Sequence, residues 1–208
     1  MSKEIDLSQI FSAVSGALQD NKASLNKADS YNQNHGDNMV QIFELITKAT
    51  QEKQGETAGN QLRYAADLVG EATQSGSAQM YVQGLQRAAK EFGDKGITLE
   101  SVTPLIQMLL NGGEKAPAGG SSGGDLVGSL LGGLSGGGKD DDGLDVGDLV
   151  GAGLAFLNAK EEGDSNLEAL TDALISGTAM GNSESGHRAQ SSQVVANTVL
   201  GLLSQLGK

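Results

Sequence analysis

Apolar residues recur through the first half of the chain at the three-to-four-residue spacing of amphipathic helices. The pattern predicts five helices, which cover approximately residues 10–18, 39–49, 59–72, 77–92 and 98–110. Asp6 precedes the first apolar stripe and Asp37 precedes the second, so we expect each aspartate to cap its helix. Pro104 falls early enough in the fifth pattern to be tolerated in a first helical turn.

The same spacing returns near the end of the chain, over residues 167–179 and 194–206, with a polar loop at 181–190 between them. Nowhere do apolar and polar residues alternate in a run flanked by turn residues, which is the pattern of a strand. The sequence therefore predicts an all-α protein of some seven to nine helices. Short connections favour antiparallel neighbours.

Glycine is concentrated in the middle of the chain. Of 31 glycines, 16 lie between Gly112 and Gly153, where residues 124–128 and 147–151 form a near-repeat. One interpretation is two short helices, each capped by the aspartate of its repeat, that pack closely or form a lid. The other is a mobile glycine-rich segment, over about residues 112–147, within a single domain of residues 1–208.

Charge and composition exclude several classes of function. The net charge of −12 opposes general binding to nucleic acids, and the absence of cysteine excludes disulfides, thiolate zinc sites and cysteine nucleophiles. An aspartate-rich run at 140–148 lacks the acid that a calcium loop would need at position 138, so we interpret it as a solvated turn. We expect no signal peptide and no membrane span, and hence a cytoplasmic protein.

Two polar loops directly precede helices and could carry chemistry. The first, at 25–39, holds oxygen donors whose spacing suits a hard cation such as magnesium, although an ordinary hydrated turn has the same composition. The candidate metal ligands in it are Asp29, Asn32, Asn34 and Asp37. In the second loop, Ser75, Gly76 and Ser77 could offer hydroxyl and backbone N–H groups to a phosphate, or simply cap the helix.

Taken together, these loops resemble the L subunit, or L domain, of the dihydroxyacetone kinases. The resemblance is carried by Leu25–Asp29, by the Asn-His-Gly-Asp-Asn-Met run that ends at Met39, and by the turn with Ser77 before Tyr81. A Gly-His pair at 186–187, followed by two serines at 191–192, extends it to the last part of the chain. It covers most of residues 1–110 and 165–208, and the glycine-rich middle does not match.

The resemblance implies an up-and-down barrel of eight helices that holds ADP or ATP with magnesium at one end. It implies a K-type partner subunit that presents a triose, and in some family members a lipid-like ligand inside the barrel. The metal ligands would be the four residues given above, and no catalytic side chain is expected from this chain. The residues expected to bind the nucleotide are His35, Gly36, Asn38, Met39, Ser75, Gly76 and Ser77.

The sequence departs from the family at the residues expected to bind magnesium. Asn32 and Asn34 stand where the family has aspartates, and an amide oxygen brings no charge to a divalent ion. Arg188 is near the family's nucleotide arginine but not at its place. Because phosphoryl transfer depends on positioned cations, we expect a divergent nucleotide-binding domain with impaired kinase activity. The alternative is a non-catalytic module that binds a lipid-like ligand, or a protein partner, through the glycine-rich segment.

Overall fold

The computed structural model describes residues 4–112, 175, 178 and 185–206, and within them the protein is entirely helical apart from one isolated bridge between Glu4 and Thr98. The described helices are α1 (Leu7–Ala28), α2 (His35–Glu52), α3 (Ala58–Ala72), α4 (Gly76–Phe92), α5 (Leu99–Asn111) and α9 (Gly186–Leu206). The all-α prediction is confirmed for these residues, whereas the barrel of eight helices is not confirmed. The glycine-rich segment, with its near-repeat, and most of the helix predicted at 167–179 lie outside the described residues.

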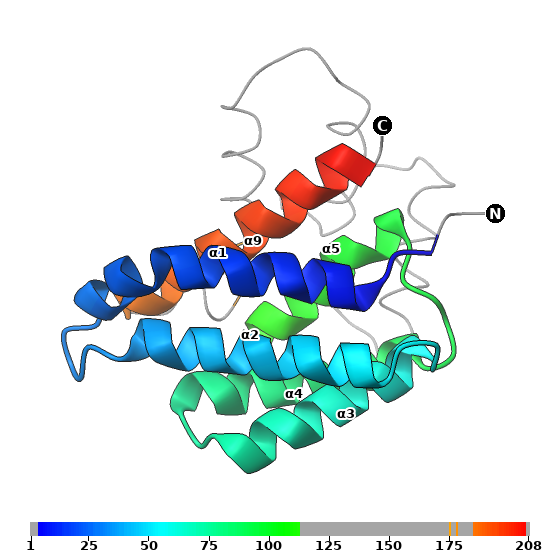
Figure 1. Cartoon of the computed structure of the whole chain (residues 1–208), viewed down its shortest axis with the longest axis horizontal. Coiled ribbons are helices and arrows are strands. Elements are labelled where there is room, and N and C mark those ends of the chain that lie inside the picture. Colours follow the sequence, from blue (N-terminus) through cyan, green and yellow to red (C-terminus); the bar gives the residue numbers. More distant parts are fainter. Residues whose placement is uncertain (1–3, 113–174, 176–177, 179–184, 207–208) are drawn as a thin grey trace, which may run out of the picture.

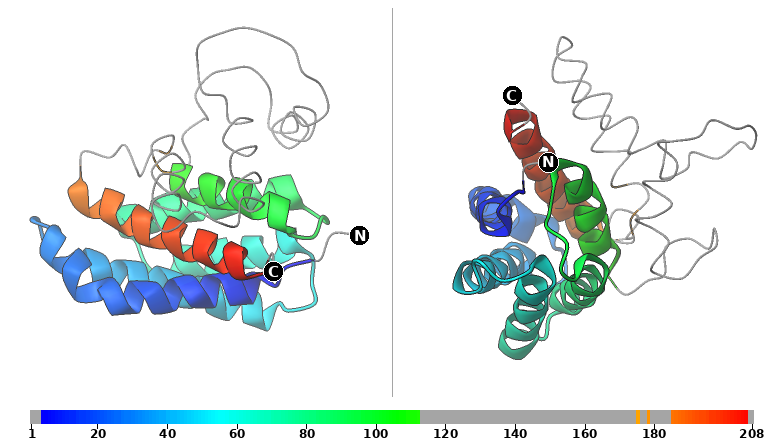
Figure 2. Two further views of the ribbon diagram at one scale, coloured as in Figure 1. Left: turned by 90° about the horizontal axis from the view of Figure 1, so that it is seen from above. Right: turned by 90° about the vertical axis from the view of Figure 1, so that its right-hand side faces the viewer.

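The helices follow one another round a bundle. Seen end-on in Figure 2, they succeed one another in the order α1, α2, α3, α4, α5 and α9, and α9 packs against α1. Neighbours along the chain run antiparallel, so α2 and α4 begin at the end of the bundle where α1 stops. The first turn of α9 lies at that end too, beside the last turns of α1 (Figure 1). Among the described helices, none is both long and apolar enough to cross a lipid bilayer.

Three aromatic rings join α1, α2 and α4 through the core. The ring of Phe43 lies 6.3 Å from that of Phe11 and 5.1 Å from that of Tyr81, measured between centroids, and it meets Tyr81 edge-on. All three side chains are fully buried. Burial of an aromatic side chain of this kind stabilises a fold by about 1.5–3 kcal/mol, so this cluster helps to fix how α1, α2 and α4 pack. The Tyr81 hydroxyl has no hydrogen-bond partner among the described residues.

Several helix ends differ from those predicted. The helix α1 continues to Ala28, beyond the end of its apolar stripe. Its last two turns are largely exposed, so polar residues are accommodated there. The N-cap of α2 is Asn34 and not Asp37, which lies in the first turn instead. The helix α9 starts at Gly186, so part of the predicted loop is helical. Pro104 lies one turn deeper in α5 than expected, where it removes a single helical hydrogen bond.

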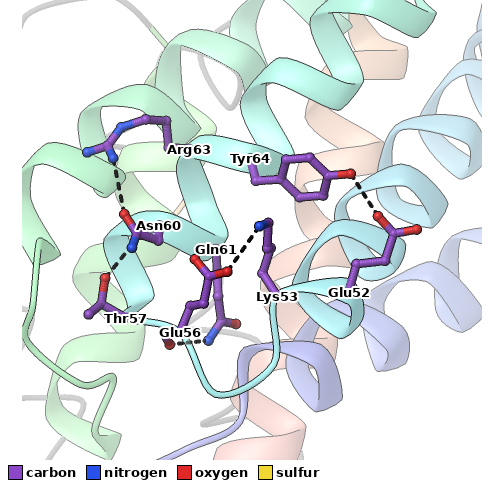
Figure 3. A network of polar contacts seen from close by, with 8 residues as sticks. All are labelled: Glu52, Lys53, Glu56, Thr57, Asn60, Gln61, Arg63 and Tyr64. Atoms are coloured by element: carbon purple, nitrogen blue, oxygen red, sulfur yellow. Dashed lines mark hydrogen bonds and ion pairs between the residues drawn. The ribbon is translucent and has the colours of Figure 1, made fainter.

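The connection between α2 and α3 is held by local polar contacts (Figure 3). The Lys53 ammonium lies 3.0 Å from the Glu56 carboxylate, and the Tyr64 hydroxyl donates to Glu52 over 2.8 Å. The Thr57 hydroxyl accepts the backbone N–H of Asn60 and so caps α3. These partners lie within about a dozen residues of one another and are largely exposed. We call this region, residues 52–64, the turn end of the bundle.

Candidate functional site

The opposite end of α2 gathers the segments that the sequence singled out. The loop after α1, the first turn of α2, the start of α4 and the first turn of α9 all meet there. We call this region the histidine end, and define it by Asp29, His35, Gly76, His187 and Arg188. The N-termini of α2, α4 and α9 lie at this end, and each helix N-terminus carries roughly half a positive charge. The histidine end therefore has positive potential from the backbone, although the chain as a whole is strongly negative.

His35 connects α2 to α9 across 156 positions of sequence. Its Nε2 lies 2.9 Å from the Ser191 hydroxyl, and its ring centroid lies 4.5 Å from that of His187. The side chain is almost completely buried, with 3% of its surface exposed. Burial lowers the pKa of His35 to about 4, the electrostatic interaction with His187 adds to the effect, and the negative charge of Asp29 opposes it. His35 is therefore neutral at pH 7.

The contact between Ser191 and His35 does not make a nucleophile. The Ser191 hydroxyl donates to the backbone carbonyl of Arg188 over 2.9 Å, which leaves the Ser191 oxygen able to accept a hydrogen bond from Nε2 of His35. With only 1% of its surface exposed, Ser191 is closed to a substrate. The pair therefore serves to fix α9 against α2 and is not a hydrolytic dyad.

Asp29 organises the loop that leads into α2. Its carboxylate accepts backbone N–H groups from Tyr31, Asn32 and Asn34 at 3.0, 3.5 and 3.3 Å. Burial favours the neutral acid, but these three hydrogen bonds lower the pKa of Asp29 below its usual value. One carboxylate oxygen also lies 3.9 Å from Nδ1 of His187. Asp29 is thus a charged group that the fold uses to hold its own backbone.

Asp37 is directed toward α1. Its carboxylate lies 3.4 Å from the Lys22 ammonium and accepts a hydrogen bond of 2.8 Å from the Asn26 side chain. The two helices come close here because residue 36 is glycine: a Cβ at Gly36 would lie 2.3 Å from the carbonyl oxygen of Lys22. Gly36 therefore serves the packing of α1 on α2.

The arrangement does not fit a magnesium ion. Magnesium requires several oxygen donors in octahedral geometry, and its protein sites use carboxylates. Here Asp29 is occupied by three backbone N–H groups and Asp37 by Lys22, while the Asn34 side-chain oxygen accepts from Asn38. Within the part of the chain that the structure describes, no three histidine, aspartate or glutamate side chains are placed to hold a metal.

The start of α4 meets α9 at Arg188. Ser75 caps α4 by accepting the backbone N–H of Ala78, as a Ser-Gly-Ser turn predicts. A Cβ added to Gly76 would lie 3.0 Å from a terminal guanidinium nitrogen of Arg188. The Arg188 Nε is buried and has no hydrogen-bond partner among the described residues. A guanidinium with donor capacity left over, beside a helix N-terminus, suits an anion.

The remaining residues predicted to bind the nucleotide are buried or engaged within the protein itself. Met39 is fully buried in the core, and Ser77 is buried at the start of α4. The Asn38 side chain donates to Asn34 within the first turn of α2. The sequence predicted His35 as a ligand but did not indicate its contact with His187 and Ser191, nor the meeting of Arg188 with Gly76. The available signal was a Gly-His-Arg run before an apolar stripe, which is typical of a helix start.

Comparison of the chain with protein families, with curated proteins and with solved structures finds no match.

Proposed function

We propose that this protein binds a nucleotide by its phosphates at the histidine end and does not itself catalyse phosphoryl transfer. One observation carries the proposal: three segments that are far apart in the sequence, and that each resemble a nucleotide-binding segment of the dihydroxyacetone kinase L domain, meet at one end of the bundle. They are the loop with His35, the turn with Gly76 and the helix start with His187.

The local chemistry agrees with an anionic ligand. Three helix N-termini and Arg188 supply positive potential, and the one carboxylate nearest to the two histidines, Asp29, is held by backbone N–H groups. The strongly negative charge of the whole chain makes such a region unusual for this molecule.

The histidine end lacks the groups that phosphoryl transfer needs among the described residues. Phosphoryl transfer needs cations on the β- and γ-phosphates and an oriented acceptor. The carboxylates of Asp29 and Asp37 are engaged by the protein itself, and Ser191 is buried. We therefore propose a binding domain that retained the nucleotide site of a kinase fold while its catalytic part was lost.

Isothermal titration calorimetry with ADP, AMP, adenosine and inorganic phosphate tests this function. The expected result is micromolar binding of ADP, weaker binding of AMP and none of adenosine, since the phosphates provide the contacts. Heat with adenosine alone, or none with millimolar ADP, would exclude the phosphate site. An assay of ATP consumption, with dihydroxyacetone and a K-type subunit added, should stay at background.

One further observation favours a protein partner, which the resemblance implies to be a K-type subunit. Tyr31 is 92% exposed, and its backbone N–H donates to Asp29, so this aromatic residue stands at the rim of the histidine end. Exposed aromatic residues are enriched in protein interfaces. If a partner docks there, Tyr31→Ser should weaken co-purification with it and leave the affinity for ADP unchanged.

A further inference from the structure

We infer that the phosphate ligand is held without a divalent metal ion, and that the guanidinium of Arg188 supplies the positive charge which a magnesium ion would otherwise bring. This inference rests on the proposed function, because it concerns how the same site holds the same ligand. It departs from what the resemblance implies, since the family's site holds its nucleotide together with magnesium.

The two acids of the loop are already engaged by the protein. A metal ion would have to displace backbone N–H groups from Asp29 and the Lys22 ammonium from Asp37 before either could coordinate it. The hydrogen bonds to Asp29 also anchor the loop that leads into α2. If Asp29 coordinated a metal, it would lose these hydrogen bonds and the loop would loosen. A preformed metal site carries no such cost.

Arg188 has the chemistry to replace the charge of a metal ion. Its guanidinium is permanently charged and presents donors in a planar fork that matches two oxygens of a phosphate. Its position is fixed at both ends. The arginine backbone carbonyl accepts hydrogen bonds from Ser191 and Ser192, and a terminal nitrogen reaches the start of α4 at Gly76. The buried Nε has no partner among the described residues, so the protein leaves part of the donor capacity of this side chain unused.

The start of α4 lies beside the Arg188 guanidinium. The first N–H groups of a helix have no partner within that helix, and at the start of α4 the Ser75 hydroxyl takes the N–H of Ala78. A phosphate that contacts both groups would receive N–H groups from the helix start and a full positive charge from the guanidinium. Glycine at 76 is what leaves room for the guanidinium, because a side chain there would contact it.

The experiment is calorimetry of the full chain with ADP, in buffer with either magnesium chloride or EDTA. We expect the two dissociation constants to agree within about twofold. The Arg188→Gln variant should bind ADP at least tenfold more weakly in both buffers, and Arg188→Lys should be intermediate, because lysine keeps the charge and loses the fork. Gly76→Ala should weaken binding as well, through its contact with the guanidinium.

Arg63→Gln is the matched control, since Arg63 lies at the turn end and bonds to Asn60. It should bind ADP as the unaltered protein does, and circular dichroism should show equal helix content in all variants. Binding of ADP only with magnesium, or unchanged binding by Arg188→Gln, would overturn the inference while the proposed function stands. Absence of ADP binding in both buffers would reject the proposed function, and the inference with it.

Discussion

The two ends of α2 hold the bundle together in opposite ways. At the turn end, exposed side chains contact others within about a dozen residues, so the chain closes the connection with local pairs (Figure 3). At the histidine end, buried polar groups on α2 meet polar groups on α9 across 156 positions. Since a buried polar group depends on its partner far more than an exposed one does, the histidine end should tolerate less change. Four predictions test that difference, in order of decreasing effect.

The largest effect is expected where α1 and α2 approach at Gly36. Gly36→Val would force branched carbon atoms against the Lys22 carbonyl, which lies only 2.3 Å from the position of a Cβ. Overpacking of this kind, at backbone that cannot move aside, should cost about 3 kcal/mol or more. Chemical denaturation measures the loss. The control is Gly16→Ala, where nothing lies within 4 Å of the added carbon and helix propensity should give a small gain.

Acid should destabilise the protein through His35. The pKa of His35 is about 4 in the folded state, below the ordinary histidine value of 6.5, so the unfolded chain binds the proton more readily. The contribution of neutral His35 to the free energy of unfolding is present in full above pH 6.5 and is lost as the pH falls from 6.5 to about 4. The upper bound of this loss is about 3 kcal/mol. Denaturation curves across this window measure it. His35→Gln, which cannot titrate, should flatten the slope; an unchanged slope would assign the titration to another group.

Removal of a single buried hydroxyl should have a moderate effect. Ser191→Ala takes away the partner of His35 Nε2 and leaves that ring nitrogen buried without one. The expected loss is about 1–2 kcal/mol in the free energy of unfolding. Ser192→Ala is the comparison within the same turn, because its hydroxyl contacts only the Arg188 carbonyl in the described structure and should cost less. Equal losses would mean that the contact with His35 contributes little.

The smallest effect is expected at the turn end. Tyr64→Phe removes the hydroxyl that donates to the Glu52 carboxylate and leaves the ring in place. Since the pair is exposed, water replaces the lost contact, and the melting temperature should stay within about 2 °C. A fall as large as that for Ser191→Ala would remove the distinction between the two ends.

The sequence predicted the helices well where their buried face is apolar and poorly where the helix is polar. The stripes of α2, α3 and α4 lie where their spacing put them, because burial of those positions determines the fold. The last turns of α1 and the first turn of α9 were missed, since exposed polar residues carry no periodic apolar signal.

For the candidate site, the sequence could identify segments but not their contacts. His35 and the serine turn before α4 stood out because each precedes a helix, and both lie at the histidine end in the structure. The meeting of His35 with His187, and of Gly76 with Arg188, depends on how α9 packs beside α1. Such an arrangement follows from the tertiary fold and leaves no local pattern.

The long span between His35 and Ser191 also bears on the order of folding. Closing a loop of 156 residues costs about 2 kcal/mol more entropy than closing the 11-residue loop that joins Asn26 to Asp37. Contacts of such high sequence separation form late, so α1 to α5 should associate before α9 does. The histidine end would then be completed in the last step of folding. A chain that has already buried its aromatic core would still be unable to hold a ligand until α9 docks.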